Sequence, residues 1–236
     1  MRKEPDVDIL FEQLQARLAR ADRSWLSRLR SLSTPLRRFI ALAATIVPWS
    51  LGMLFAQRQL RAVWEAYATS HLLGVLLALL MFLLFAVWLC TRPLYQPALP
   101  QGVTVGFVTL IAIGSAGIAW LAPLSEPWSI ASLTHQVHAS LRGHDPCLYK
   151  GLFIVGLPMY ALVHLLNRGV WWSAYLNAGV AGLSAMLMLQ VQCSINHRLH
   201  YLMGHAGVLL TLLSAVGLLY AIQRVRAKPR PAVDDP

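Results

Sequence analysis

Cysteine and histidine side chains are the residues of this chain best suited to chemistry, and two of the three cysteines lie close to histidines in the sequence. His144 precedes Cys147, and three histidines follow Cys193: His197, His200 and His205. Thiolate and imidazole groups together favour soft or borderline ions such as Zn, Cd or Cu(I). The spacing matches no established ligand signature, so metal binding is one interpretation of these residues among three.

The other two interpretations of Cys147 and Cys193 need no metal. The first is a permanent structural disulfide, which is stable outside the cytoplasm. The second is a redox-reactive pair, because nearby basic residues (Arg142, Lys150 and Arg198) favour the reactive thiolate. Local sequence leaves all three interpretations open, and the choice depends on where the rest of the chain places the two thiols.

Six long apolar segments must position these thiols. The chain has 236 residues, of which 57% are hydrophobic and 13% charged, whereas a soluble domain is about one-quarter charged. A transmembrane helix needs about 20 mostly apolar residues, and only a helix satisfies its own backbone in lipid. We therefore predict an all-α bundle of six transmembrane spans, at residues 38–56, 71–91, 102–122, 148–166, 170–190 and 203–222.

The distribution of positive charge predicts the orientation of this bundle. With the N-terminus inside, the inner segments carry 15 of the 20 Lys and Arg residues and the outer loops carry 5. The positive-inside rule then assigns both termini to the cytoplasm. Cys147 and Cys193 come to the outer boundary on adjacent antiparallel spans, close enough for a disulfide. Cys90 lies near the inner end of its span and is expected to be a small packed side chain.

Three regions follow from these spans: a cytoplasmic extension at 1–37, the transmembrane domain at 38–222 and a basic cytoplasmic tail at 223–236. The extension has apolar residues at roughly helical spacing with polar residues between them. Such a helix lies on the inner membrane surface or docks in the groove of a partner protein. The residues predicted to form the partner-binding stripe are Leu10, Leu14, Leu18, Trp25 and Leu29.

The absence of certain residue types and motifs from the sequence disfavours several functional classes. No ionisable residue lies near a predicted midplane, which argues against transport and proton relay. The chain has no C-x-x-C motif, which a membrane thiol oxidoreductase normally carries. The high positive charge is interpreted as a topology determinant that contacts anionic lipid rather than nucleic acid.

An ordered set of residues from 147 onward resembles one protein family. The set begins at Cys147-Leu148 and includes Pro158 in the fourth span; it ends at Cys193. Between them stand Leu166-Asn167-Arg168-Gly169 at an inner turn and Ala178-Gly179-Val180-Ala181-Gly182-Leu183 in the fifth span. These residues resemble the NrsF family of bacterial integral-membrane anti-sigma factors, over about 75 residues. Thr34-Pro35-Leu36-Arg37-Arg38 before the first span agrees with that layout.

The resemblance implies a regulator of the bacterial inner membrane without a catalytic centre and without a resident cofactor. Its cytoplasmic portion would hold an extracytoplasmic-function (ECF) sigma factor, and Cys147 and Cys193 would sense heavy-metal or oxidative stress. The chain departs from the family pattern after Cys193, where Met203-Gly204-His205 replaces an aromatic pair. A metal-assisted form of sensing, with a transient heavy-metal ion at the thiols, therefore stays open. The alternatives are a membrane thiol-disulfide oxidoreductase and a small-molecule transporter with a structural disulfide.

Overall fold

The computed structural model of the protein is a helical bundle, and it describes residues 25–55, 69–93, 96–97, 99–121, 146–167, 171–193 and 198–226. No strand occurs in these ranges. Two segments, η1 and η2, are π-helical and are continuous with the helices on either side of them. The elements in chain order are α2 (Trp25–Ser31), α3 (Thr34–Phe55), α5 (Thr69–Cys90), α6 (Gln101–Leu121), α8 (Pro146–Lys150), η1 (Gly151–Gly156), α9 (Leu157–Leu166), α10 (Trp171–Gln192), α11 (Arg198–His200), η2 (Tyr201–Ala206) and α12 (Gly207–Arg226).

Five helical segments in the described part of the chain are long and apolar enough to cross a membrane. They are Leu72–Cys90, Gln101–Leu121, Cys147–Leu166, Ser173–Gln192 and Arg198–Arg226. These segments coincide with the second to sixth predicted spans, and they indicate a multi-pass membrane protein. Helix α3 occupies the position of the first predicted span but is not among the five, so the count of six stays a prediction.

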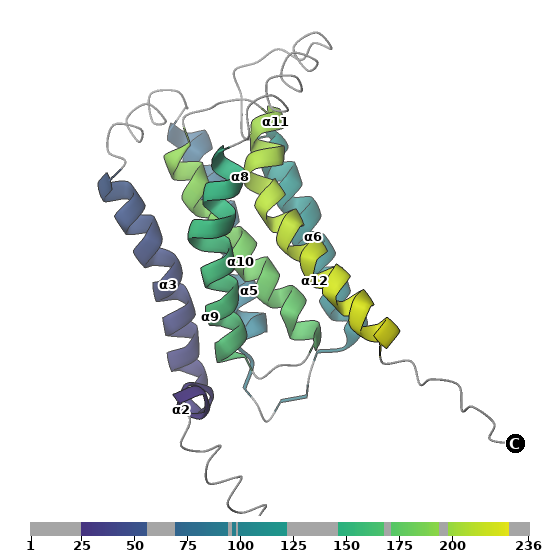
Figure 1. Ribbon diagram of the computed structural model, residues 1–236. Coiled ribbons are helices and arrows are strands. Elements are labelled where there is room, and N and C mark those ends of the chain that lie inside the picture. Colours follow the sequence, from purple (N-terminus) through teal and green to yellow (C-terminus); the bar gives the residue numbers. More distant parts are fainter. Residues whose placement is uncertain are drawn as a thin grey trace, which may run out of the picture.

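Helix α10 is the centre of the bundle. It contacts α3, α5, α6, α9 and α12, and Figure 1 shows these helices arranged around it. Between Ala178 and Val191 every residue of α10 is buried. Small side chains make this possible, because membrane helices associate through close packing rather than through exclusion of water. Gly182 is the clearest case: an added Cβ would lie 2.7 Å from the Cα of Leu209 in α12.

The outward faces of the surrounding helices are apolar, as a lipid-facing surface requires. Leu77 and Met81 in α5 are 59% and 67% exposed, Ile113 in α6 is 67% exposed, and Leu218 in α12 is 64% exposed. Exposed apolar residues on several neighbouring helices are unusual for a soluble monomer. The surface therefore agrees with the five membrane-spanning segments.

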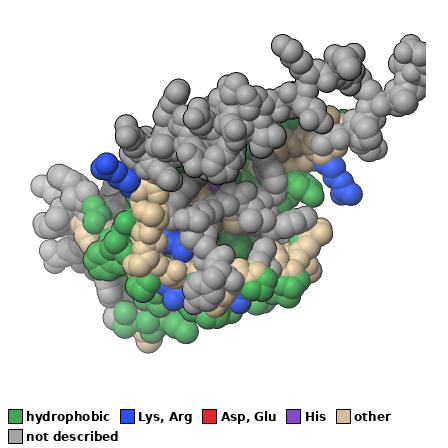
Figure 2. All heavy atoms as spheres, turned by 90° about the horizontal axis from the view of Figure 1, so that it is seen from below, with side chains coloured by type: hydrophobic (Ala, Val, Ile, Leu, Met, Phe, Trp, Pro, Cys, Tyr) green, Lys and Arg blue, Asp and Glu red, His purple; other side chains and the backbone are tan. Residues whose placement is uncertain are grey.

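The end of the bundle that holds Arg37, here called the Arg37 end, is rich in basic residues. Arg37 is 1% exposed, and its guanidinium donates hydrogen bonds to the carbonyl oxygens of Leu166 and Arg92, each at 3.4 Å. These bonds tie the start of α3 to the chain just after α5 and to the last residue of α9. Figure 2 looks onto this end and shows Lys and Arg side chains across it.

The close approach of α10 and α12 at Gly182 gives a first prediction. Replacing Gly182 with alanine should lower the free energy of unfolding by about 1–3 kcal/mol, because the new methyl group overlaps Leu209. Thermal unfolding of the purified protein in detergent measures this effect. Gly106→Ala in α6 is the matched control, since nothing lies within 4 Å of its added Cβ. Equal stability of the two variants would contradict the packing described.

Candidate functional site

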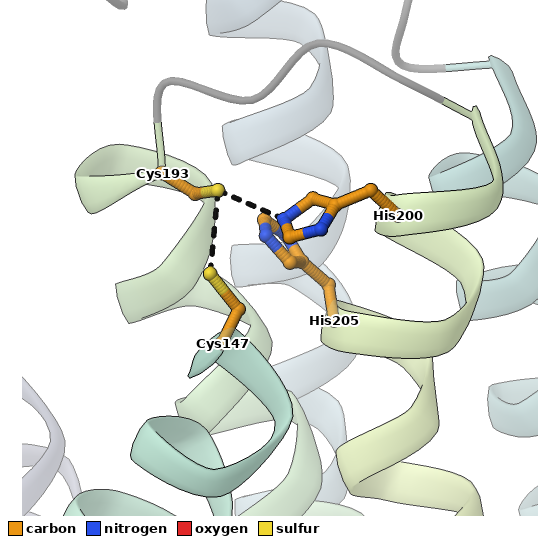
Figure 3. A group of neighbouring side chains, drawn as sticks. All are labelled: Cys147, Cys193, His200 and His205. Atoms are coloured by element: carbon orange, nitrogen blue, oxygen red, sulfur yellow. Dashed lines mark hydrogen bonds between the residues drawn. The ribbon is translucent and has the colours of Figure 1, made fainter. Parts of the chain in front are cut away.

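Two thiols and two imidazoles meet at the end of the bundle opposite to Arg37, here called the Cys147 end. The side chains are Cys147, Cys193, His200 and His205, and one sulfur or nitrogen atom from each lies within 4.8 Å of the others. Figure 3 shows all four pointing toward a common centre. We call these four residues the Cys/His cluster.

The sulfur atoms are in direct contact. Cys147 Sγ lies 3.4 Å from Cys193 Sγ, and Cys193 Sγ lies 3.0 Å from His200 Nε2. No disulfide joins the two cysteines in the structure. A disulfide requires about 2.05 Å between the sulfurs, so a shift of little more than 1 Å separates the two states. The predicted proximity of Cys147 and Cys193 is confirmed.

Each cluster residue is placed by a helix end or by a π-helical segment. Cys147 lies in the first turn of α8, next to Pro146, and proline suits the first helical position because its nitrogen needs no partner there. Cys193 follows α10 directly, and its backbone N–H still donates to the carbonyl of Leu189 at 2.8 Å. The two sulfurs are therefore held by regular backbone rather than by the loops that follow or precede them.

The π-helical segment η2 explains how two histidines five positions apart reach one site. In an α-helix, residues five apart point about 140° away from each other, because each residue turns by about 100°. In a π-helix the backbone bond joins residues five apart, which stacks them on one face. Segment η2 covers Tyr201–Ala206, so it brings His200 and His205 together, with ring centroids 5.5 Å apart.

Glycines in η1 let the helix that carries Cys147 approach its neighbours. An added Cβ on Gly151 would lie 2.7 Å from Leu189 Cδ1 in α10 and 2.8 Å from Val208 Cγ2 in α12. Gly156, at the other end of η1, is also buried. The absence of side chains at these positions allows three helices to converge next to the cluster.

The cluster is largely shielded from solvent. Cys193, His200 and His205 are 5%, 7% and 1% exposed, while Cys147 is partly buried. Tyr201 packs against His205 with ring centroids 4.4 Å apart. No Asp or Glu occurs anywhere in the described ranges, so no carboxylate of the described residues belongs to this site.

Some predicted site residues lie outside the described residues: His144, His197, Leu10, Leu14 and Leu18. The two histidines are untested as ligands, and the partner-binding stripe stays a prediction. Trp25 lies in α2. Leu29, also in α2, is partly buried against the hydrophobic core, and α2 contacts α9.

A second polar cluster at the Arg37 end was not predicted from the sequence. Cys90 Sγ donates to Asn177 Oδ1 at 2.8 Å, and Asn167 Nδ2 lies 3.0 Å from Cys90 Sγ and 2.9 Å from Asn177 Oδ1. Asn177 Nδ2 lies 3.3 Å from His164 Nδ1. Cys90 is buried, as expected, but it joins α5 to α9 and α10 through these bonds. The sequence signal was the pair of asparagines, of which Asn167 directly follows α9 and Asn177 lies within α10.

The fold and the Cys/His cluster define a multi-pass helical membrane protein with soft ligand atoms gathered at one end. No family model, no curated protein and no solved structure matches the chain.

Proposed function

We propose that this protein is an integral-membrane anti-sigma factor. It holds an ECF sigma factor at the membrane and releases it when Cys147 and Cys193 react with a heavy metal or an oxidant. The proposal rests on the resemblance to the NrsF family, and it assigns the protein a regulatory role rather than an enzymatic one.

The observation that carries the sensing role is the 3.4 Å separation of two sulfurs from residues 46 positions apart. A ligand shifts a conformational equilibrium only by its differential affinity for two states. Oxidation pulls α8 toward the end of α10, whereas metal capture ties both segments to α11–η2. Either reaction changes the packing of the segment that contains α8, η1 and α9 against α10. The thiols are thus suited to convert a chemical event into a helix movement.

Helix α10 connects the Cys147 end of the bundle, where the thiols lie, to the Arg37 end, where the sigma factor is proposed to bind. It begins near the Asn177 cluster and ends next to Cys193, and α9 runs beside it. At the Arg37 end, α9 contacts both α2 and α3. The predicted sigma-binding extension precedes α3, so a shift of α9 against α10 reaches the segment from which the extension leaves the bundle.

The proposed orientation places the Arg37 end in the cytoplasm of the bacterial inner membrane, with six spans and both termini inside. The charges of the described residues support it. Seven basic residues belong to the Arg37 end (Arg28, Arg30, Arg37, Arg38, Arg92, Arg224 and Arg226), and two belong to the Cys147 end (Lys150 and Arg198). Retention of positive charge on the cytoplasmic side favours this assignment.

Co-expression tests the sigma-binding role directly. The full chain, tagged and solubilised in detergent, should co-purify with one ECF sigma factor when each such sigma factor of its genome is co-expressed in turn. A sigma factor that co-purifies equally with an unrelated six-span protein does not count as a partner. Failure of every ECF sigma factor to co-purify would refute the proposed function.

A membrane thiol-disulfide oxidoreductase is the second candidate. It is favoured by the 3.0 Å contact of Cys193 Sγ with His200 Nε2, because a neighbouring imidazole can accept the thiol proton and activate the sulfur. Repeated turnover of a dithiol substrate with a quinone as electron acceptor would support this candidate over the regulator.

A further inference from the structure

We propose that Cys147, Cys193, His200 and His205 form a four-coordinate site for a divalent thiophilic cation of the Zn²⁺ and Cd²⁺ class. The site deepens the sensing part of the proposed function, because it uses the same two thiols, but it does not depend on sigma binding. It assigns specific ligand roles to two histidines that the resemblance leaves unexplained.

The donor atoms select the class of ion. Two sulfurs and two imidazole nitrogens converge, and such Cys₂His₂ sets hold Zn²⁺ tetrahedrally in proteins. Hard cations such as Ca²⁺ and Mg²⁺ need oxygen ligands, and no carboxylate occurs in the described ranges. The site therefore favours a soft or borderline ion over the abundant hard cations.

The distances are close to those that a tetrahedral ion needs. With Zn–S of about 2.3 Å and Zn–N of about 2.0–2.1 Å, ligand atoms stand roughly 3.3–3.8 Å apart. The Cys147 and Cys193 sulfurs are 3.4 Å apart, Cys193 Sγ and His200 Nε2 are 3.0 Å apart, and all four ligand atoms lie within 4.8 Å of one another. Movements of about 1 Å or less complete the tetrahedron.

The charge balance suits a buried site. A divalent ion with two thiolates and two neutral imidazoles has no net charge, whereas an unpaired charge in a poorly solvated site is costly. Binding replaces the two thiol protons with two metal–sulfur bonds and releases both protons to water. No electron transfer occurs in this step, so no oxidant or reductant is needed.

The π-helical backbone of η2 is an independent observation in favour of a metal site at the Cys/His cluster. Single-turn π-helices in membrane and soluble helices are frequent at functional sites. Here the π-helix has a defined consequence, since it places His200 and His205 on one face. An ion bound there joins α8, the end of α10 and α11–η2, which are three separate segments of the chain. While it is bound, the two sulfurs cannot form a disulfide.

The experiment is a metal titration of the purified, reduced full chain in detergent, with Zn²⁺ delivered from a chromophoric competitor. One Zn²⁺ should bind per chain. Cys147→Ser and Cys193→Ser should each lower the affinity at least about a hundredfold, and His200→Gln and His205→Gln at least about tenfold. Co²⁺ should give the visible spectrum of a tetrahedral ion with sulfur ligands.

Cys90→Ser and His164→Gln are the matched controls, because they change residues of the same types at the Arg37 end, where Cys90 is buried and His164 is exposed. Both should bind Zn²⁺ like the wild type. Absence of one-to-one binding by the wild type would overturn the site, and equal losses in the controls would do so as well. Wild-type affinity in both histidine variants would overturn the four-ligand set.

A second measurement needs no variant and does not depend on folding of the substituted proteins. Zn²⁺ should slow alkylation of Cys147 in the wild-type protein by at least about tenfold, since a metal-bound thiolate is not available to the reagent. An unchanged alkylation rate at saturating Zn²⁺ would contradict the site. Neither measurement involves a sigma factor, so its failure is distinguishable from failure of the proposed anti-sigma role.

Discussion

Replacing Cys147 and Cys193 together with serine is expected to abolish stress-induced release of the sigma factor while basal binding is retained. The physical reason is that serine fills nearly the same space but forms neither a disulfide nor a strong bond to a soft metal. In the wild type, a coupling of about 3 kcal/mol between the thiols and the binding surface corresponds to about a hundredfold change in sigma affinity. A sigma-dependent reporter, measured with and without Cd²⁺, gives this ratio.

The control for this prediction is Cys90→Ser, which removes the remaining cysteine of the chain. Cys90 lies at the opposite end of the bundle and bonds to Asn177, so its replacement should leave the induction ratio unchanged. If the double variant responds to Cd²⁺ as strongly as the wild type, the sensing role of the two thiols is wrong.

Deleting residues 1–30 is expected to free the sigma factor permanently, with the reporter fully active in the absence of stress. The reason is the apolar stripe of the extension, which is predicted to bury its leucines against the sigma factor. The expected change equals the full induction range of the reporter, about a hundredfold if the coupling is about 3 kcal/mol. Membrane insertion of the shortened chain must be verified by its fractionation with the inner membrane.

A substitution series separates loss of the stripe from loss of chain length. Leu10→Ser, Leu14→Ser and Leu18→Ser combined should reproduce the deletion, whereas Gln13→Ser with Gln15→Ser, on the polar side, should not. Survival of sigma co-purification after the deletion would place the binding surface on the inner loops or the tail instead.

Much of the fold follows from composition and hydrophobic length alone. The apolar stretch Leu72–Leu89 contains no charged residue, and it lies within a segment apolar enough to span a membrane. Small residues around Gly182 suit close helix packing, and α10 is buried from Ala178 to Val191. The length of an apolar segment and the size of its side chains are local properties of the sequence, so the spanning segment and the close packing of α10 can be inferred from it.

The site was predicted only in part. Opposite chain directions of two adjacent spans were enough to place Cys147 beside Cys193. The convergence of His200 and His205 was not predictable by helical periodicity, because that calculation assumes an α-helix and separates them by about 140°. Gly151 of the other π-helical segment packs against Val208, just after η2, and such contacts between distant segments have no sequence pattern.

The polar contacts at the Arg37 end were missed for a related reason. Arg37 was counted as a basic residue before the first span, yet it is buried and bonds to Leu166 and Arg92. These two partners are backbone carbonyls from distant parts of the chain, which have no sequence signature, whereas a third partner is the nearby Thr34 hydroxyl. Asn167 and Asn177 likewise meet only because α9 and α10 form a tight hairpin.

The most direct test of the proposed anti-sigma role is the affinity of the purified full chain for the ECF sigma factor it is proposed to bind, in detergent, with and without Cd²⁺. Cd²⁺ at one equivalent is expected to weaken binding about a hundredfold in the wild type and to leave binding by the Cys147→Ser/Cys193→Ser variant unchanged. An affinity that Cd²⁺ does not alter in the wild type, or alters equally in both proteins, would contradict this expectation.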